Sequence, residues 1–311
     1  MKKITLYAGL SLLALLLLVE ISLRSFLGLG NPPLSVEHPE IHYMFKPNQD
    51  IQRFGNRIKI NEFGMRSEDF SADKPEDEFR ILIFGDSVVN GGNLTDQEDL
   101  ATSLLKEKLQ PYFPNGVTVG NVSAGSWGPG NWLAYAEEFG FFEADKVFLV
   151  ISSHDSADMP TFAPLNPNTH PTQKPLLATS ELLIRYVLPR AGIRLGRPDH
   201  TGPGFTLEER METSLNDLEA FLQKALDTEA EVRVFHHWEL PEIEAGEAKE
   251  GFAFIKEVVE SLDIPFHSMH DTFAQQQRDG PSPYRDNIHP NETGQELLAK
   301  EIFSTFPTKR P

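Results

Sequence analysis

The chain has 311 residues and carries 46 acidic side chains against 28 basic ones, a formal net charge of −18. This balance excludes a general binder of phosphate backbones, which needs clustered lysine and arginine, so no nucleic-acid partner is expected. Hydrophobic residues at 40% and charged residues at 24% are typical of a globular protein with a sizeable core. The absence of cysteine excludes a disulfide scaffold, a thiolate zinc site and a cysteine nucleophile.

The N-terminus is basic and then strongly apolar. Two lysines precede an apolar run over residues 4–19, which at a helical rise of about 1.5 Å per residue spans roughly 24 Å. The helical pattern continues with Glu20 and Arg24, a favourable pair four residues apart, and no small-residue cleavage site follows. We therefore expect residues 1–30 to form an uncleaved signal-anchor helix, with a cleaved signal peptide as the alternative. The lysines would face the cytoplasm, which places the rest of the chain outside that membrane, in a periplasm or at the cell surface.

Residues 31–79 form a polar connector with two short strand-like segments. Ile41–Phe45 and Arg57–Asn61 have strand composition and are separated by proline, asparagine and glycine. We expect one small hairpin that leans on the main domain.

From Arg80 to residue 306, short apolar runs alternate with amphipathic stretches. The expected strands are Ile81–Phe84, Val117–Val119, Val147–Ile151, Val232–Phe235 and Ile264–Phe266. The expected helices are Leu100–Leu109, Trp132–Phe139, Leu207–Leu226, Phe252–Leu262 and Glu292–Phe303. Short apolar strands spaced by helices predict a parallel sheet covered on both faces, with its ligand site at the carboxyl edge of the strands.

A proline-rich interval at residues 155–205 interrupts this alternation. Eight prolines occur between Ser152 and Phe205, with one short helix expected around Glu181–Leu188. The interval follows the third strand, so it is interpreted either as a cap over the site or as a passive surface insertion.

Two short motifs stand at opposite ends of this alternating region. Gly85-Asp86-Ser87 follows the first strand, which puts the Ser87 hydroxyl and backbone N–H at the carboxyl edge of the sheet. Asp286 and His289 stand three apart on a loop before the last helix, where the carboxylate can accept from Nδ1–H and leave Nε2 free for a serine proton. Each motif alone could be ordinary turn and capping residues. Together they predict a serine nucleophile with a general base.

With Gly85-Asp86-Ser87 and Asp286-x-x-His289-Pro290, the chain from Arg80 to Phe303 resembles the SGNH (GDSL-type) hydrolase superfamily. The resemblance implies a flavodoxin-like three-layer α/β/α fold and a Ser87–His289–Asp286 triad. It also implies an oxyanion hole built from the Ser87 N–H, a second-block glycine N–H and a third-block asparagine side chain. The motif Asn61-x-x-Gly64-x-Arg66 and the N-terminal anchor are similar to membrane-tethered members, whose relatives hydrolyse carbohydrate and lipid esters or transfer O-acetyl groups.

Two positions depart from the family pattern. Ser123 stands where the second-block glycine is usual, so its backbone N–H is the expected donor and Gly125 is a rival. His154 stands in the place of the third-block asparagine. A neutral imidazole can donate one N–H, so His154 is the expected third donor, with a satisfied loop histidine as the alternative. A missing donor would cost roughly 3 kcal/mol in transition-state binding.

Other polar and aromatic residues near the strand ends carry weaker expectations. Three tryptophans could either stack on sugars or be buried. These are Trp127, Trp132 and Trp238. Four histidines match no zinc-binding spacing, so no metal is expected, and they are His236, His237, His267 and His270. Six carboxylates are expected to face solvent or cap turns, and they are Asp155, Asp158, Glu239, Glu242, Glu244 and Glu247.

The sequence therefore predicts a membrane-anchored serine esterase, without a cofactor, that acts outside the cytoplasmic membrane on an acylated carbohydrate or lipid. Two alternatives remain open. One is an O-acyltransferase acting on an envelope polysaccharide or exopolysaccharide, because hydrolase and transferase share every catalytic part. The other is a non-catalytic polysaccharide-binding scaffold with an impaired site.

Overall fold

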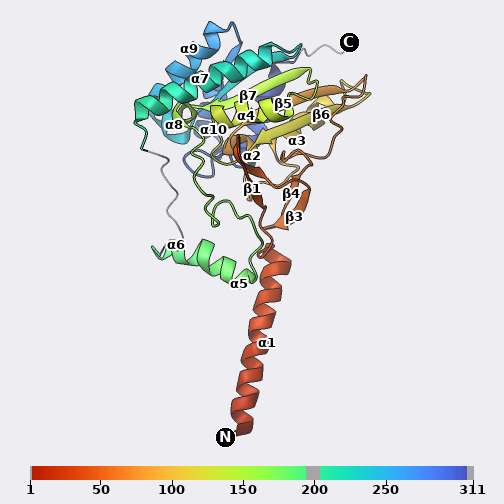
Figure 1. The fold of residues 1–311 in the computed structure, drawn as a ribbon, viewed down its shortest axis with the longest axis vertical. Helices are drawn as coiled ribbons and strands as arrows, with labels where there is room; N and C mark the ends of the chain where they lie inside the picture. The colour runs from red at the N-terminus through yellow and green to blue at the C-terminus, as the bar shows by residue number, and fades with distance from the viewer. Residues whose placement is uncertain (1, 194–203, 307–311) are drawn as a thin grey trace.

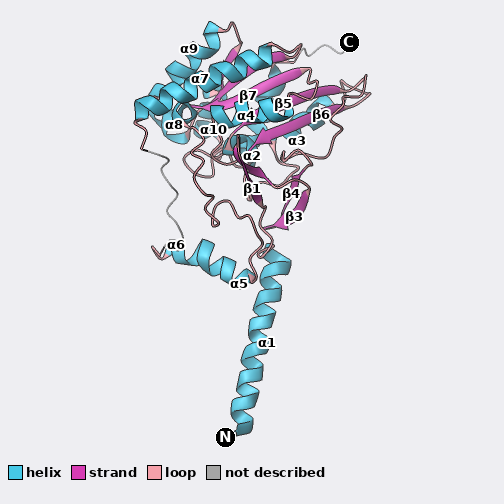
Figure 2. Cartoon of the chain, in the orientation of Figure 1, coloured by secondary structure: helices cyan, strands magenta, loops and turns pink. Residues whose placement is uncertain are grey.

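The computed structural model describes residues 2–193 and 204–306, and its core is a five-stranded parallel sheet (Figures 1 and 2). The strand order is β6-β5-β7-β8-β9, and every neighbouring pair is parallel. These strands are β5 (Phe79–Gly85), β6 (Val117–Ser123), β7 (Lys146–Ser152), β8 (Glu231–His237) and β9 (Phe266–Ser268). The predicted α/β fold with a parallel sheet is confirmed.

Helices cover both faces of this sheet. One face packs against α4 (Pro129–Phe139), α7 (Leu207–Leu226) and α9 (Glu250–Ser261). The other face packs against α3 (Ala101–Leu109), α10 (His270–Asp279) and α11 (Glu292–Ser304). Along β5, Leu82 and Phe84 belong to the first core, while Ile81 and Ile83 belong to the second. A strand that is buried on both faces has to be apolar at every position, which explains the continuous apolar runs.

The strand order reverses at β5. The chain passes from β5 to β6 on one side and then returns to β7 on the other side of β5. In doubly wound sheets the connections diverge at such a point and leave a crevice at the carboxyl edge. The short helix α2 (Ser87–Asn90) begins directly after β5, so Ser87 lies at this position.

Several short elements differ from the sequence prediction. Helices α2, α8 (Leu240–Ala245) and α10 were not predicted, and the last strand is β9 at residues 266–268 rather than 264–266. Helices α2 and α8 contain four and six residues, too few turns to show a 3.6-residue period. Helix α10 has ten residues but buries only Phe273 and Ala274, so its apolar face is too narrow to show the period.

The connector forms two hairpins rather than the one expected. Strand β1 (Ser35–His38) pairs with β2 (His42–Phe45), and β3 (Gln49–Arg53) pairs with β4 (Asn56–Ile60), both antiparallel. The two predicted strand segments therefore belong to different hairpins. Each strand pairs with its immediate chain neighbour, because closing a short loop orders less chain than closing a long one.

The first helix, α1 (Lys2–Leu27), projects away from the globular body (Figure 1). Among the described residues it supplies one segment, Lys3–Leu27, that is long and apolar enough to cross a membrane. Its side chains from Ile4 to Leu18 are exposed to the surroundings. A single apolar helix near the N-terminus is compatible with a membrane span and with a signal sequence.

The described part of the proline-rich interval runs from the carboxyl edge of the sheet toward the end of α1 (Figure 1). It opens with the 3₁₀ helix η1 (Ser153–Ala157) and later forms α5 (Ala178–Glu181), the π-helix η2 (Leu182–Val187) and α6 (Leu188–Arg190). Its middle part lies along the β1–β2 hairpin, where Ser35 N–H donates to Pro171 O over 2.8 Å. The same stretch contacts β2, where His42 Nε2 lies 2.9 Å from Ala163 O and the His42 ring lies against the ring of Phe162. Residues 194–203, near the end of this interval, lie outside the described part of the chain.

Candidate active site

Three side chains from the two ends of the catalytic region form one chain of hydrogen bonds. His289 Nε2 lies 2.9 Å from Ser87 Oγ, and His289 Nδ1 lies 2.8 Å from Asp286 Oδ2 and 3.0 Å from Oδ1. With the proton on Nδ1 donated to Asp286, Nε2 has a free lone pair facing the serine hydroxyl. This is the arrangement that lets an imidazole take a proton from a serine.

The loop that carries His289 is held in place by its own backbone. Asp286 Oδ1 accepts from the N–H groups of Ile288 and His289, each over 2.9 Å, and Arg285 N–H donates to His289 O over 2.8 Å. Burial alone would raise the pKa of Asp286, but these backbone bonds and the pairing with His289 outweigh it and lower that pKa. Asp286 therefore stays ionised and fixes the orientation and tautomer of the imidazole.

The turn that carries Ser87 requires a glycine. A Cβ on Gly85 would lie 2.4 Å from Val89 Cγ2 and 3.1 Å from Val150 O, so a larger residue would push the turn away from β7. Asp86 caps α2, because its Oδ1 accepts from Val88 N–H over 2.7 Å. Ser87 is thereby placed at the first position of a helix, where its N–H has no partner inside the helix.

Two backbone N–H groups beside Ser87 are available to hold an anion. Among the described residues, neither the Ser87 N–H nor the Gly125 N–H forms a hydrogen bond. Gly125 is half-buried in the turn after β6, and a Cβ placed on it would meet only open space. Ser123 is buried inside β6 and is its last residue paired with β5, whereas Gly125 lies beyond the paired strand. The geometry favours Gly125 over Ser123 as the second donor.

His154 does not present a free N–H, contrary to the expectation that it replaces the oxyanion asparagine. Its Nδ1 lies 3.1 Å from Glu239 Oε1 and its Nε2 lies 3.3 Å from Asp86 Oδ2, while Asp155 Oδ1 is 3.6 Å away. Burial works against the charged ring, but Asp155, Asp86 and Glu239 outweigh it and raise the pKa of His154 to about 12. His154 is therefore an imidazolium whose two N–H groups face carboxylates.

His154 in turn supports the nucleophile turn. Burial tends to raise the pKa of Asp86, yet the hydrogen bond and charge of His154 outweigh burial and lower it. The ionised Asp86 then caps α2 with one oxygen and pairs with the charged ring of His154 through the other. The positive charge of His154 is thus linked to the nucleophile turn through Asp86, whose Oδ2 lies 3.5 Å from Ser87 Oγ.

The expectation that the nearby carboxylates face solvent is wrong for Glu239 and Glu242, whereas Asp155 caps the start of η1, one of its two expected roles, by accepting from Ser152 N–H over 2.7 Å. Asp155, Glu239 and Glu242 are buried, with exposed fractions of 2% or less. Glu239 pairs with His154 and Lys249, and Glu242 accepts from Ser153 Oγ and from two backbone N–H groups. Ser153 and His154 lie 89 and 85 positions from these partners, so the sequence pattern carries no sign of the two contacts. Asp158 is half-exposed, and Glu244 and Glu247 are exposed as expected.

The residues that could hold a metal ion are Asp86, His154 and Asp155. Each offers one ligand atom, and these atoms lie within 4.8 Å of one another. Burial raises the pKa of Asp155, whereas the pKa of Asp86 is lowered, so the positive charge of His154 already balances the charge of this cluster. This cluster differs from the four histidines considered in the sequence. His236 and His237 are buried and have lowered pKa values, to about 3 for His236, because burial disfavours the charged ring.

All three tryptophans are buried, which decides between the two readings of these residues. Trp132 Nε1 donates to Gly85 O over 2.9 Å and so supports the turn before Ser87. Trp127 donates to Tyr43 O and Trp238 donates to Ser268 Oγ. None of these rings is free to stack on a sugar.

Arg66 is a further supporting residue whose role the sequence did not show. Its guanidinium is fully buried and donates to the carbonyl groups of Asn90, Gly92 and Thr95 at the end of α2. The motif Asn61-x-x-Gly64-x-Arg66 therefore serves to attach the connector to the loop after the nucleophile. Asn61 Oδ1 forms the turn that delivers Arg66, because it accepts from the N–H groups of Phe63 and Met65.

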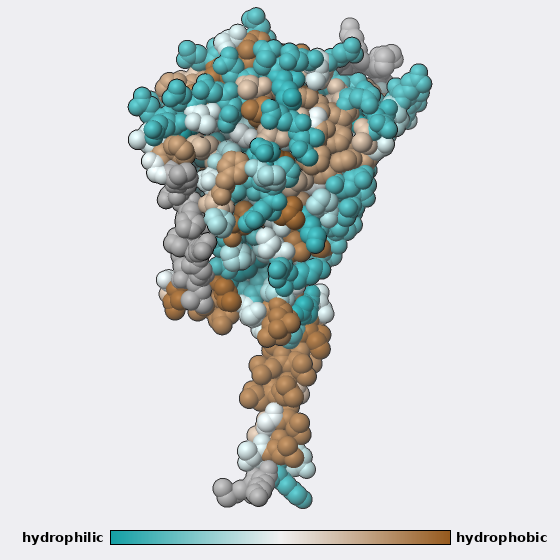
Figure 3. Space-filling view, in the orientation of Figure 1, coloured by the Kyte–Doolittle hydropathy of each residue, from teal (hydrophilic) through white to brown (hydrophobic). Residues whose placement is uncertain are grey.

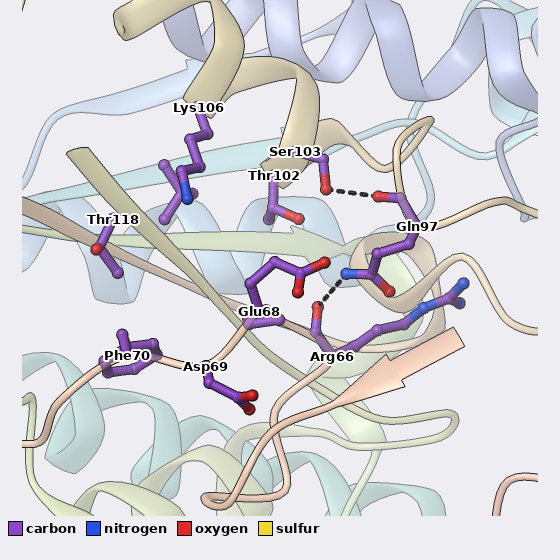
Figure 4. Close-up of a pocket in the computed structure, with 11 residues that line it drawn as sticks. Arg66, Glu68, Asp69, Phe70, Gln97, Thr102, Ser103, Lys106 and Thr118 are labelled. Atoms are coloured by element: carbon purple, nitrogen blue, oxygen red, sulfur yellow. Dashed lines mark hydrogen bonds between the residues drawn. The ribbon is translucent and has the colours of Figure 1, made fainter. Parts of the chain in front are cut away.

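A separate pocket lies between α3, β6 and the connector (Figure 4). Glu68 and Lys106 point into it, and its wall includes Gln97, which donates to Arg66 O over 3.3 Å. None of the residues that line this pocket belongs to the Ser87–His289–Asp286 group. It is therefore distinct from the candidate active site.

The chain resembles one known protein family and several solved structures. The model of the GDSL-like Lipase/Acylhydrolase family matches residues 83–297. No curated protein matches the chain. Among solved structures, a two-domain esterase (CEX) active on acetylated mannans is 17% identical with a TM-score of 0.47, covering 73% of this chain and 48% of the other. The chain thus spans about half the length of that esterase.

Two further solved structures have comparable scores. A catalytic mutant of Axe2, an acetylxylan esterase from Geobacillus stearothermophilus, is 14% identical with a TM-score of 0.47, covering 73% of this chain and 93% of the other. The acetyl xylan esterase AlAXEase is 13% identical with a TM-score of 0.47, covering 74% of this chain and 100% of the other. The match over residues 83–297 spans more than half of the sequence, and the chain belongs to the GDSL-like lipase/acylhydrolase family of ester-bond hydrolases.

Proposed function

We propose that the chain is a serine esterase in which Ser87 is the nucleophile, His289 the general base and acid, and Asp286 the residue that orients the imidazole. One observation carries this proposal: His289 bridges Ser87 Oγ at 2.9 Å and Asp286 Oδ2 at 2.8 Å. Residues about two hundred positions apart meet in this geometry, and the chemistry of acyl transfer needs all three.

The proposed reaction has two steps. Ser87 Oγ attacks the ester carbonyl carbon while its proton moves to His289 Nε2, and the N–H groups of Ser87 and Gly125 hold the oxyanion. Collapse of this intermediate breaks the ester C–O bond, the imidazolium returns the proton to the leaving alkoxide, and the acyl group stays on Ser87. A water molecule then attacks the acyl carbon and gives a proton to His289. The bond between that carbon and Ser87 Oγ breaks, the acid leaves, and His289 returns the proton to Ser87 Oγ.

The proposed substrate is an acyl ester of a carbohydrate or a lipid. Hydrolysis is preferred to acyl transfer because the triad is open to water. The side chain of His289 is 37% exposed and that of Asp286 is 53% exposed. An acyl-enzyme in such a site meets water readily, whereas a transferase has to exclude it.

We also propose that α1 remains attached and anchors the esterase to a membrane, with the catalytic domain on the extracytoplasmic side. Glu20 accepts from the backbone N–H groups of Ala178 and Thr179, and Arg24 donates to Leu176 O. The end of α1 is thus bonded to the folded domain. Removing α1 as a signal peptide would strip these partners from the domain, which favours an uncleaved anchor.

A fluorophosphonate probe tests the catalytic proposal on the full chain in detergent. We expect the probe to label the wild type, to fail on Ser87→Ala and to label a control, Ser261→Ala, in which an exposed serine on α9 is removed. A wild type without labelling would overturn the proposal and favour a binding module. Acetyl release to water, measured against acetyl transfer to an added oligosaccharide, then separates an esterase from an acyltransferase.

A further inference from the structure

A row of apolar side chains is exposed on the segment from residue 176 to residue 193. Leu176 is 90% exposed, and four more are about half exposed, namely Leu177, Leu183, Val187 and Ile193. In the space-filling view, hydrophobic surface gathers on this segment and continues on α1 (Figure 3). Water disfavours such a surface, so its exposure indicates an apolar partner.

The orientation of this segment relative to α1 is fixed by polar contacts. α5 and α6 lie across the direction of α1, at the level where α1 enters the body (Figure 1). The Glu20 carboxylate accepts from Ala178 N–H over 2.7 Å and from Thr179 N–H over 3.0 Å, at the start of α5. Arg24 donates to Leu176 O over 2.8 Å. The segment is therefore attached to one particular turn of α1.

A buried ion pair also attaches this segment to the β3–β4 hairpin and to the end of α1. Glu181 is buried, pairs with Arg53 of the β3–β4 hairpin and lies 3.0 Å from Arg185. It also accepts from Gly30 N–H over 2.6 Å, just after α1 ends. Breaking a buried pair of this kind is costly, so the segment, the hairpin and the end of α1 move as one unit.

The apolar part of α1 that precedes this unit is about as long as the hydrocarbon core of a bilayer is thick. Residues 3–19 precede Glu20 and rise about 25 Å at 1.5 Å per residue, close to the roughly 30 Å hydrocarbon core of a bilayer. If α1 spans a bilayer, Glu20 and Arg24 lie where the hydrocarbon core ends. The segment bonded to them then lies in the interface, parallel to the membrane plane.

The charges on the segment fit an anionic surface. The chain has a net charge of −18, yet the exposed charged side chains of residues 170–193 are both basic, Lys174 and Arg190. Arg24 at the end of α1 is also partly exposed. Basic side chains beside an apolar row are the pattern of interfacial helices, whose cations contact lipid headgroups.

We propose that residues 176–193 form a second membrane contact, which lies in the interface of the bilayer with its apolar side chains among the lipid acyl chains. This inference depends on the anchoring role proposed for α1 and not on the esterase activity. The partner is a lipid bilayer with anionic headgroups. The contact fixes both the height and the orientation of the catalytic domain above the membrane, because one helix alone would let the domain rotate and tilt.

The absence of cysteine allows a direct test, since each introduced cysteine is the only thiol in the protein. The full chain is reconstituted into vesicles of phosphatidylcholine and phosphatidylglycerol, and a nitroxide label is placed on Leu183→Cys or Val187→Cys. Leu13→Cys reports on the span. Leu226→Cys is the matched control, an exposed leucine at the end of α7. Collision rates of each label with oxygen, which enriches in lipid, and with a water-soluble nickel chelate are measured.

We expect the labels at 183 and 187 to collide more with oxygen than with nickel, as the label at 13 does, and the label at 226 to show the reverse. Labels at 183 and 187 that behave like the label at 226, while the label at 13 reports lipid, would overturn the interfacial contact and leave the anchor intact. A label at 13 that reports water would overturn the anchor and the contact together. Spin–spin broadening at 183 that disappears when labelled chains are diluted with unlabelled ones would show a second copy on this face, which also overturns the proposal. Fluorophosphonate labelling of the same samples reports on the esterase separately.

Discussion

Replacing Asp286 with asparagine separates the position of His289 from its tautomer. Asp286 Oδ1 accepts two backbone N–H groups over 2.9 Å, and an asparagine oxygen in the same place can accept both. The amide nitrogen would then replace Oδ2, 2.8 Å from His289 Nδ1. Because an amide nitrogen donates, Nδ1 has to accept and the ring proton moves to Nε2. The imidazole would then donate toward Ser87 and could no longer take its proton.

The expected loss in kcat for Asp286→Asn is about two to three decades, or about 3–4 kcal/mol of transition-state stabilisation. A buried aspartate in the same role is worth about four decades. Here the Asp286 side chain is 53% exposed, so water screens the pair and the other tautomer remains accessible in a fraction of molecules. The loss should therefore be smaller than for a buried pair.

The assay is hydrolysis of a p-nitrophenyl acyl ester by the full chain in detergent, together with the melting temperature. Asp286→Asn should lose kcat and keep the melting temperature, because the loop retains its two backbone hydrogen bonds. Asp271→Asn is the control, since Asp271 is fully exposed and lies 2.9 Å from His270 Nδ1 in a comparable pair. Asp286→Asn with activity within about threefold of the wild type would refute the assigned role of Asp286.

Three further predictions concern the supporting residues. His154→Ala and His154→Asn should both lower the free energy of unfolding by about 3 kcal/mol, because each leaves buried carboxylates without a cation. An asparagine variant with wild-type stability and turnover would instead support the expectation that residue 154 donates to the oxyanion. Burial lowers the pKa of folded His236 to about 3, so stability present above its unfolded pKa of about 6.5 is lost as the pH falls toward 3, by up to about 1.4 kcal/mol per pH unit. His236→Gln should lose less stability than the wild type between pH 6.5 and pH 4.5 in urea titrations. An equal loss in both proteins would contradict this prediction. Arg66→Met should cost about 3 kcal/mol and slow fluorophosphonate labelling, because three carbonyl groups at and after the end of α2, two of them in buried bonds, lose their donor. A variant that melts and labels like the wild type would show that the loop does not depend on Arg66.

The local sequence pattern was sufficient to predict the sheet and to bring Ser87, Asp286 and His289, the proposed triad, to one edge of it. Strands buried on both faces have to be apolar throughout, so β5, β7 and β8 are visible as short apolar runs. Parallel strands bring their carboxyl ends to one edge, and this rule places Ser87 after β5 at the site edge. The spacing of Asp286 and His289 also reflects local geometry, because the loop closes on its own backbone.

The surroundings of His154 were decided only by the tertiary structure. Its partners Asp86 and Glu239 lie 68 positions before it and 85 positions after it in the chain, and no local period relates them. Whether a histidine donates to an oxyanion or carries a buried charge depends on how many carboxylates face it, which the sequence alone does not reveal. The same reason explains why Glu239 and Glu242 were expected at the surface and are buried.

The path of the proline-rich interval was likewise decided by long-range contacts. Its composition indicated an irregular segment but not the surface on which it lies. Glu20 bonds to Ala178 across 158 positions, and Arg53 pairs with Glu181 across 128. Local amino-acid preferences act over a few residues, so they determine which segments form helices and strands. Which distant charges meet depends on the folded arrangement, because a buried charge is stable only where the whole chain supplies its partner.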